Sequence, residues 1–354
     1  MKSNYRYIVK AFMAMAVIAG TTSCDDFLDR EPMSSISPET YYSTAAQLEA
    51  NLNDEYPNVL PSFGQWTYGI FGEDKGTDNQ IEVNANDRYT QDRWKVPHSE
   101  SDNWKFERIY RINFFLSEAL PKFGEDMSGS QNTISGSVAT IKHYIGEMYF
   151  LRAYEYFKKL QLFGDFPIIN QPLADEMEAL REASKRFPRN EVARFIISDL
   201  DKAYAYMSDV DMATTRINKD VAMLVKSRVA LFEATWLQNF KGTAFVPGGE
   251  GWPGASLHNN YQYPSGNIDN EVKYFLEQAV EASKLVADKY KGSLTENTGV
   301  LQQSADDPSN PYFDMFAQED LSDVKEVLLW RQMPADSLLI TSMPLPDVVI
   351  TVSV

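Results

Sequence analysis

Residues 140–163 constrain the fold more than any other part of the chain, because they are apolar over most of a helical circumference. The apolar members at helical spacing include Ile141, Ile145, Met148, Leu151, Tyr154 and Phe157. Only a narrow polar strip remains, formed by Arg152, Glu155 and Lys158. A helix that is apolar nearly all round must be covered on most sides by other elements. We therefore predict a central, buried helix with further helices packed around it.

Helical periodicity recurs in at least six segments, and no comparable series of alternating residues predicts strands. The clearest of the other helical segments cover residues 109–120, 190–207, 218–236 and about 270–290. Asp102, Asn190 and Asn218 stand where the N-caps of three of these helices are expected. Pro121 and Gly124 are expected to end the first of them. The predicted fold class is all-α.

Long insertions separate the predicted helices. The helices that begin near residues 140 and 218 are too far apart for a strict tetratricopeptide array, whose repeat is about 34 residues. Residues 61–101 and 241–269 combine aromatic side chains with many loop-forming residues. Segments of this length without regular structure are usually functional or disordered, and the aromatic content argues against disorder. We predict a helical-repeat scaffold, in which helix pairs stack on one another, with long functional loops.

The N-terminus has the features of a secretory signal peptide. Lys2, Arg6 and Lys10 precede a short apolar run over residues 11–20, and small residues stand directly before Cys24. The run is too short to span a membrane, which takes about 20 residues. The arrangement resembles the lipobox of bacterial lipoproteins, in which the cysteine is acylated and becomes the new N-terminus. The alternative is a free or buried thiol at Cys24.

This interpretation divides the chain into a signal peptide, residues 1–23, and a mature domain, residues 24–354. Because Cys24 is the sole cysteine, no disulfide can form within the chain. The 50 acidic residues against 33 Lys and Arg give a net charge of −17, which would repel a phosphate backbone. Nucleic acid is therefore not expected as a partner.

The sequence contains no clear catalytic motif. His98, His143 and His258 are far apart, and neither triad nor zinc-site spacing is present. His143 lies on the buried helix, where a hydrogen-bonded core role is expected. Asp74, Asp78, Asn79 and Asp87 supply enough oxygens for calcium but lack the order of an EF-hand, which favours a solvated loop. We predict no catalytic residue, no metal and no cofactor, although a carboxylate pair that is formed only in space stays open.

Several segments together resemble the SusD/RagB family of outer-membrane nutrient-binding lipoproteins of the Bacteroidetes. They are Cys24–Pro32, Ser37–Tyr42, the residues Trp104, Tyr110, Ile112 and Asn113, and then Glu147–Phe157, Leu162–Ile168, Asp199–Leu200 with Ala203, Ser227–Phe232, Tyr312–Phe313 with Phe316, and Lys325–Leu328. The resemblance runs to about residue 331. It implies a tetratricopeptide-like α scaffold, a lipid anchor in the outer membrane, exposure at the cell surface, and a face of loops that binds glycan. It also implies a partner, a TonB-dependent transporter of the SusC type.

The last segment, residues 332–354, does not resemble the family, whose members usually continue well beyond this point. We interpret the chain as a truncated or frame-shifted product, with a short natural member as the alternative.

A glycan site needs flat apolar rings for the C–H faces of sugars, flanked by groups that hydrogen-bond hydroxyls. The ring candidates in the two insertions are Trp66, Tyr68, Trp94, Trp252, Tyr261 and Tyr263. The polar candidates are Asp78, Asn79 and Asn260. Packing in the core is the alternative for every ring, and it is favoured for Trp104 and Trp236, which fall on predicted helical faces.

The favoured hypothesis is a non-catalytic lipoprotein at the cell surface that binds oligosaccharide and delivers it to the transporter. A second hypothesis is a helical-repeat scaffold that binds protein or peptide in a concave groove. A third is a lipid-anchored glycoside hydrolase, which would hold two carboxylates about 5–10 Å apart in a cleft.

Overall fold

The computed structural model describes residues 41–60, 103–124, 126–207, 212–301, 304, 306–316, 318–332 and 349–351. The chain divides into a unit of residues 1–41 and a unit of residues 42–354. The described helices and strands all lie in the second unit.

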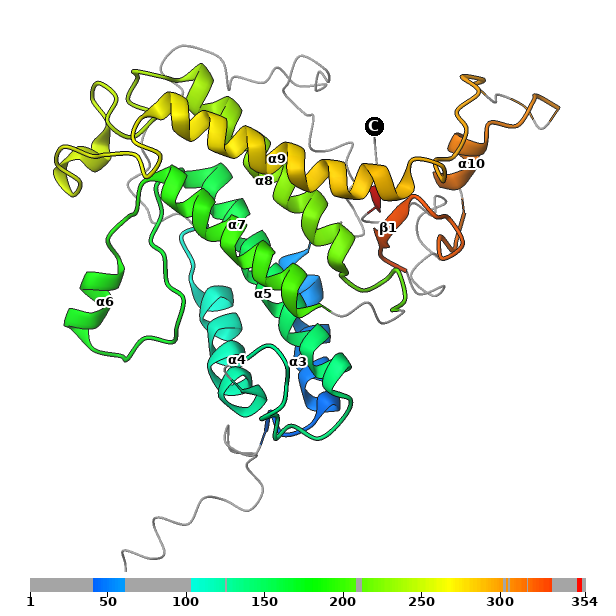
Figure 1. The fold of residues 1–354 in the computed structure, drawn as a ribbon, viewed down its shortest axis with the longest axis horizontal. Helices are drawn as coiled ribbons and strands as arrows, with labels where there is room; N and C mark the ends of the chain where they lie inside the picture. Colours follow the sequence, from blue (N-terminus) through cyan, green and yellow to red (C-terminus); the bar gives the residue numbers. More distant parts are fainter. Residues whose placement is uncertain are drawn as a thin grey trace, which may run out of the picture. The chain divides into compact units, whose positions relative to one another are not determined.

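The described part of this unit is built mainly from helices (Figure 1). The helices are α3 (Ala45–Val59), α4 (Glu107–Phe123), α5 (Val138–Phe163), α6 (Met177–Ala183), α7 (Arg189–Tyr206), α8 (Lys219–Asn239), a 3-10 turn η3 (Pro253–Ser256), α9 (Ile268–Tyr290) and α10 (Pro311–Phe316). Two short strands, β1 (Val327–Trp330) and β2 (Val349–Thr351), pair antiparallel. The all-α prediction is confirmed, and the strand pair, which includes three residues of the atypical C-terminal segment, was not predicted.

Helix α5 is the central element, as the apolar run predicts. It packs against α3, α4 and α7, while α7 packs against α8 and α8 against α9. Ile141, Ile145, Met148 and Leu151 are fully buried. Short helix α6 buries no residue and stands apart from the stack at the end of two extended stretches (Figure 1).

Two members of the narrow polar strip on α5, Arg152 and Glu155, are themselves buried. Arg152 donates two hydrogen bonds, of 2.7 and 2.9 Å, to the carboxylate of Asp199 on α7, and a third of 2.9 Å to Asn113 on α4. Because these partners lie on neighbouring helices, the charge is neutralised inside the helix stack. Arg152 thus joins α5 to α4 and α7.

His143 has the predicted core role. Its side chain is 1% exposed, and Nε2 lies 3.0 Å from the carbonyl of Ile217 and 3.1 Å from a carboxylate oxygen of Glu147. Glu147 also accepts hydrogen bonds from Arg216 and from Tyr56 on α3. This polar cluster fixes α3 and the start of α8 against α5.

The helix starts show which caps were predicted correctly. Asn218 caps α8 by accepting from two backbone N–H groups, as predicted, and Asn267 caps α9 in the same way from one N–H group. The prediction for Asn190 is wrong, because α7 begins one residue earlier and Asn190 is buried inside it. Helix α4 begins at Glu107, five positions after Asp102, and it runs through Pro121 to end before Gly124.

Candidate functional site

The segment between α8 and α9, residues 241–267, is the one predicted functional insertion that the structure describes, and we call it the glycine-rich loop. It is a chain of tight turns, closed for example by the hydrogen bond from the Glu250 N–H to the Gly242 carbonyl (3.1 Å). Gly249 is required here, since a Cβ at this position would lie 1.9 Å from the carbonyl oxygen of Thr243. Asn260 takes the left-handed conformation, with φ of 55°, that asparagine tolerates best after glycine. The loop is therefore ordered by its own turns.

Trp252 supports the loop from inside. Its side chain is only 5% exposed, and the indole N–H donates a 2.8 Å hydrogen bond to the carboxylate of Asp165. One face stacks near His258, with the ring centroids 6.0 Å apart. The prediction that this ring stacks on a sugar does not fit the structure, because the ring is covered by protein.

Tyr261 and Tyr263 lie next to Trp252 and are half-buried. The centroid of Tyr261 is 5.6 Å from that of Trp252 and 5.2 Å from that of Tyr263. The hydroxyl of Tyr261 lies 2.9 and 3.1 Å from the side-chain amide atoms of Asn190, and the hydroxyl of Tyr263 donates to the Pro247 carbonyl at 2.7 Å. Burial raises the pKa of both phenols, so both stay protonated. Each ring is fixed at its polar end and leaves part of its surface exposed.

Two buried ion pairs fasten the scaffold below the loop. Arg189 at the start of α7 donates to both carboxylate oxygens of Glu233 on α8, at 2.9–3.1 Å. Burial raises the pKa of Glu233, and the guanidinium works against that rise. Arg189 also donates its backbone N–H to Asp165 at 2.9 Å, so the same residue is linked to the support of Trp252.

The second pair joins the loop to α7 and α9. Arg194 donates to both oxygens of Glu271 at 2.7 and 2.8 Å, and to the hydroxyl of Ser265 in the loop at 2.7 Å. Burial alone would raise the pKa of Glu271, but hydrogen bonds from Arg194, Asn190 and Ser265 hold that pKa below its usual range. The carboxylate is thus held ionised at the root of the loop.

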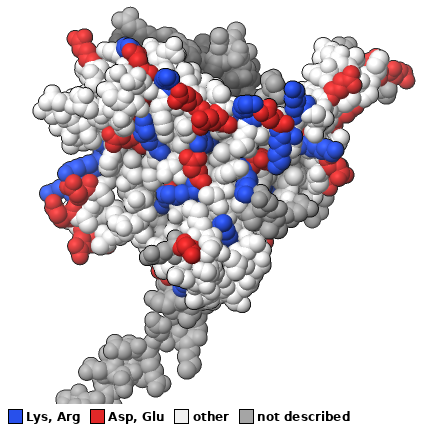
Figure 2. All heavy atoms as spheres, viewed as in Figure 1, with Lys and Arg blue, Asp and Glu red and all other residues white. Residues whose placement is uncertain are grey.

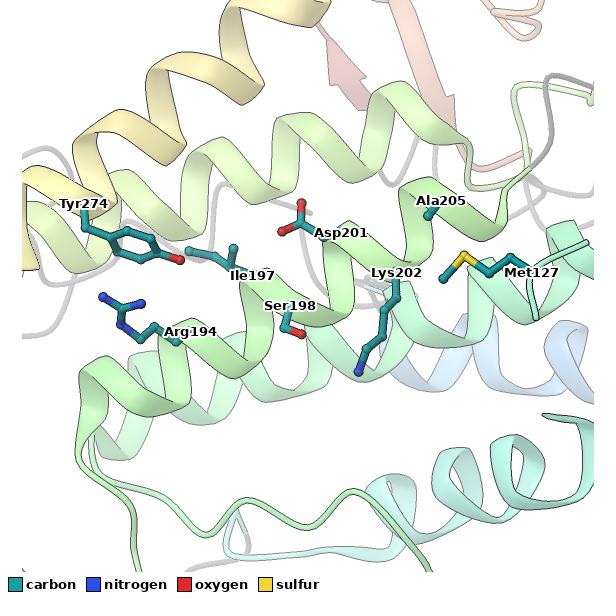
Figure 3. Close-up of a pocket in the computed structure, with 8 residues that line it drawn as sticks. All are labelled: Met127, Arg194, Ile197, Ser198, Asp201, Lys202, Ala205 and Tyr274. Atoms are coloured by element: carbon teal, nitrogen blue, oxygen red, sulfur yellow. The ribbon is translucent and has the colours of Figure 1, made fainter. Parts of the chain in front are cut away.

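Arg194 also lines a groove on the outer face of α7 (Figure 3). The groove has a volume of about 350 Å³ and is lined by Met127, Arg194, Ile197, Ser198, Asp201, Lys202, Ala205 and Tyr274. The Arg194 guanidinium lies 3.7 Å from the centroid of the Tyr274 ring, which α9 places over it. One aromatic ring beside hydroxyl, carboxylate and ammonium groups is a set that can hydrogen-bond a polyhydroxylated ligand. Arg194 therefore contacts both this groove and the glycine-rich loop, the latter through Ser265.

Of the predicted glycan-binding residues, the structure brings four together in the loop: buried Trp252, half-buried Tyr261 and Tyr263, and exposed Asn260. The remaining five, Trp66, Tyr68, Asp78, Asn79 and Trp94, lie outside the described residues, as does the predicted lipidation site Cys24. Their roles stay predictions.

Sequence reasoning missed the residues that hold the loop. In the sequence, Asp165 was noted only within the family-like segment Leu162–Ile168, and Asn190 only as a cap, whereas in the structure both hold aromatic residues of the loop. Arg194 and Glu271 gave no local signal, because the two positions are far apart in sequence and meet only through the packing of α7 near α9. An acid between aromatic residues, here Asp165 between Phe163 and Phe166, is a sequence pattern that could have pointed to this role.

The surface of the loop differs in charge from the rest of the chain. Residues 241–267 contain only Lys241 and Glu250 as charged residues. Figure 2 shows this uncharged lobe on the left of the view, with Lys, Arg, Asp and Glu gathered over the helices beside it. Within the described ranges, no group of three or more His, Cys, Asp or Glu side chains could hold a metal ion. No helix among these residues is long and apolar enough to cross a membrane.

The fold and the loop define the class: a helical-repeat scaffold with a long insertion that is rich in glycine and aromatic residues. A family model for SusD-like proteins, described as "Starch-binding associating with outer membrane", matches residues 26–231. Since this match covers more than half of the chain, the chain belongs to the SusD-like family. The resemblance seen in the sequence is therefore confirmed.

Individual relatives are distant. SusD-like protein P2 of Formosa agariphila is 25% identical over 253 residues, which are 68% of this chain and 46% of that protein. SusD-like protein P25 of the same organism is 25% identical over 60% of this chain and 41% of its own length. A solved SusD-like structure from Bacteroides fragilis aligns with a TM-score of 0.50 at 16% identity, covering 86% of this chain and 48% of that one. The fold is thus the SusD-like helical-repeat fold, and the chain spans less than half the length of these proteins.

Proposed function

We propose that this chain is a cell-surface lipoprotein that binds oligosaccharide without cleaving it and delivers it to a TonB-dependent transporter of the SusC type. The observation that carries the proposal is membership of a family described as starch-binding and associated with the outer membrane. The names of the relatives P2 and P25 do not specify a ligand. The proposed ligand class therefore rests on the family description and on the composition of the glycine-rich loop.

The glycine-rich loop supports a carbohydrate ligand on chemical grounds. It is nearly uncharged, and it presents partly exposed tyrosine rings beside the exposed amides of Asn259, Asn260 and Gln262. Aromatic faces and uncharged hydrogen-bonding groups suit the C–H faces and hydroxyls of sugars. Trp66, Tyr68, Trp94, Asp78 and Asn79 stay proposed members of the same site.

Weak binding is expected of such a site. About half of one aromatic side chain's area, at roughly 25 cal/mol/Å², gives about 2–3 kcal/mol per stacked ring before the cost of association is subtracted. Two or three rings then give an affinity between about micromolar and millimolar. This affinity suits a receptor that passes its ligand on.

The binding test is retention of the full chain, in detergent, on affinity gels that contain soluble starch, laminarin, mannan or xylan. Retardation by one or more of these polysaccharides, without release of reducing ends, is the expected result. Migration unchanged in every gel would refute carbohydrate binding. New reducing ends would refute the non-catalytic role.

The anchor and the partner need separate tests. We expect the wild-type chain to fractionate with outer membranes and Cys24→Ser to be released, because acyl chains supply about 0.8 kcal/mol for each buried CH₂. A TonB-dependent transporter should co-purify with the tagged full chain from those membranes. Equal membrane retention of both forms would refute acylation at Cys24, and a purified chain without a transporter would refute delivery through that partner.

A further inference from the structure

Three charged residues near the end of α5 lie beside the two points where the first predicted insertion joins the scaffold. Lys158 and Lys159 are consecutive, and Glu155 lies about one turn before them. We call these three residues the α5 clamp. The side chain of Glu155 is 5% exposed and that of Lys159 is 10% exposed. Charged groups are costly to bury unless other groups compensate them, so the partners of these side chains indicate their role.

The two lysines bind the chain on both sides of residues 61–101. Lys158 donates a hydrogen bond of 2.8 Å to the carbonyl of Val59, the last residue of α3. Lys159 donates one of 2.9 Å to the carbonyl of Asn103, four positions before the start of α4. Val59 stands two positions before the insertion, and Asn103 stands two positions after it. Adjacent residues of one helix therefore hold both ends of the inserted segment.

Glu155 links the two ammonium groups. Its carboxylate lies 2.6 Å from Nζ of Lys158 and 3.3 Å from Nζ of Lys159. Burial lowers the pKa of Lys158, whereas the contact with Glu155 raises it. The shared carboxylate therefore favours the charged form of the lysine that donates to the end of α3.

The end of α3 uses a cation from another helix. The last carbonyls of a helix lack partners within the regular hydrogen-bond ladder, and the last turn of α3 contains no basic residue. Lys158 supplies both a donor and a positive charge there, which the helix dipole favours at this end. The direction in which the chain leaves α3 is therefore fixed in part from α5.

We propose that the α5 clamp positions the insertion of residues 61–101 for ligand binding, with Lys158 and Lys159 as positioning residues. The proposal rests on the proposed carbohydrate function, which assigns five residues of this insertion to the glycan site. Release of either end lowers the fraction of molecules whose insertion is in position to bind, and the apparent affinity falls with that fraction.

The test compares variants that each remove one donor and keep a side chain of similar length, Lys158→Met and Lys159→Met. Each of them leaves Glu155 paired with the other lysine, so the carboxylate keeps a cation. The triple variant, which adds Glu155→Met to both replacements, removes all three charges together and serves if a single variant is unstable. Lys142→Met is the matched control, because Lys142 lies near the opposite end of α5.

The first readout is limited proteolysis of the full chain in detergent by trypsin, without ligand. The insertion contains four trypsin sites, after Lys75, Arg88, Arg93 and Lys95. Each clamp variant should be cut there about tenfold faster than the wild type, the change expected from the loss of one hydrogen bond with a charged donor. Cleavage in α6 at Arg181, whose side chain is 70% exposed, should be unchanged and is the internal control.

The second readout is the affinity of each folded variant for a polysaccharide that retards the wild type in the gels. The clamp variants should bind at least about threefold more weakly, and Lys142→Met should bind like the wild type. Thermal unfolding shows how much of each variant is folded. A merely structural role would lower the unfolding temperature but leave both the affinity of the folded molecules and the sites of cleavage unchanged.

The outcomes separate this proposal from the carbohydrate function. Faster cleavage within residues 61–101 together with weaker binding supports the clamp. If the wild type binds but every clamp variant binds like Lys142→Met, the clamp proposal is overturned while the carbohydrate function stands. Cleavage of the insertion at the wild-type rate in every clamp variant also overturns the clamp proposal alone. If no polysaccharide binds the wild type, the carbohydrate function fails and the positioning role fails with it.

Discussion

Replacing Trp252 with Phe tests whether this residue acts as a support of the loop. The substitution keeps a ring in the buried site and removes the indole N–H that donates to Asp165 at 2.8 Å. A hydrogen bond to a charged group contributes about 1.5–3 kcal/mol, so we expect Trp252→Phe to lower the free energy of unfolding by about this amount at pH 7. Trp252→Ala also leaves a cavity and is expected to cost about 3–5 kcal/mol.

The pH dependence of this loss identifies Asp165 as the partner. Burial raises the pKa of Asp165 above its usual value, and the N–H groups of Trp252 and Arg189 oppose the rise. Because the pKa of Asp165 is higher in the folded state than in the unfolded state, the folded state binds the proton more tightly. Stability therefore falls as the pH rises from the unfolded-state pKa to the folded-state pKa. Trp252→Phe should raise the pKa of Asp165 in the folded state further, because one opposing N–H donor is lost. The variant should therefore lose more stability than the wild type over the same increase in pH. Well below the unfolded pKa, only a neutral hydrogen bond of about 0.5–1.5 kcal/mol is missing.

The assay is urea unfolding, followed by far-UV circular dichroism, at pH 7 and near pH 3.5, below the usual aspartate pKa of about 3.9. Tyr263→Phe is the matched control, since it removes a hydrogen bond to a neutral carbonyl in the same loop and should show the same loss at both pH values. The reasoning is refuted if Trp252→Phe unfolds like the wild type at pH 7, or if its deficit is unchanged at low pH. Folded Trp252→Phe should also keep its affinity for glycan.

Further substitutions test three other features of the scaffold in the same unfolding assay. Glu233→Ala leaves the buried Arg189 unpaired and should lower the free energy of unfolding by about 3–5 kcal/mol. The double replacement Glu233→Leu with Arg189→Met removes both charges and should be close to neutral. A small loss in Glu233→Ala would contradict this argument. Asn218→Ala removes the cap of α8 and should cost about 1 kcal/mol, and Asn267→Ala about as much at α9; no loss in either would refute the capping argument. Glu271, whose folded pKa is held low, contributes stability above the unfolded pKa that is lost as pH falls through the folded pKa. The deficit of Glu271→Gln should therefore shrink on acidification, and a constant deficit would contradict it.

Periodicity predicted the helices well because each signal is contained in one segment. The buried run on α5 specifies a central helix from its own residues, and the apolar faces of α7, α8 and α9 follow the same spacing. Caps are harder to predict, since an asparagine near a helix start can instead hydrogen-bond side chains from other elements. Asn218 caps α8, whereas Asn190 is used by Tyr261 and Glu271.

The candidate site was predicted less completely, because composition marks a loop as functional without showing which rings are covered. Trp252 and Phe245 both lie in the glycine-rich loop. Trp252 is buried because it packs against Asp165 and His258, whereas Phe245 is exposed. Trp236 shows the opposite error, since a helical face suggested a core residue although the ring is only half-buried. The strand pair β1–β2 depends on residues that are far apart in sequence and so gave no local signal.

The two ion pairs explain how the glycine-rich loop is held in one geometry on the helices. Apolar contacts are weakly directional, whereas a bidentate guanidinium–carboxylate pair fixes both distance and orientation. Arg189–Glu233 fastens the floor under Trp236, and Arg194–Glu271 fastens the root of the loop at Ser265. Burying these charges is not a favourable source of stability in itself, so their value lies in placement. The acidic scaffold is therefore joined by directional contacts to a nearly uncharged lobe.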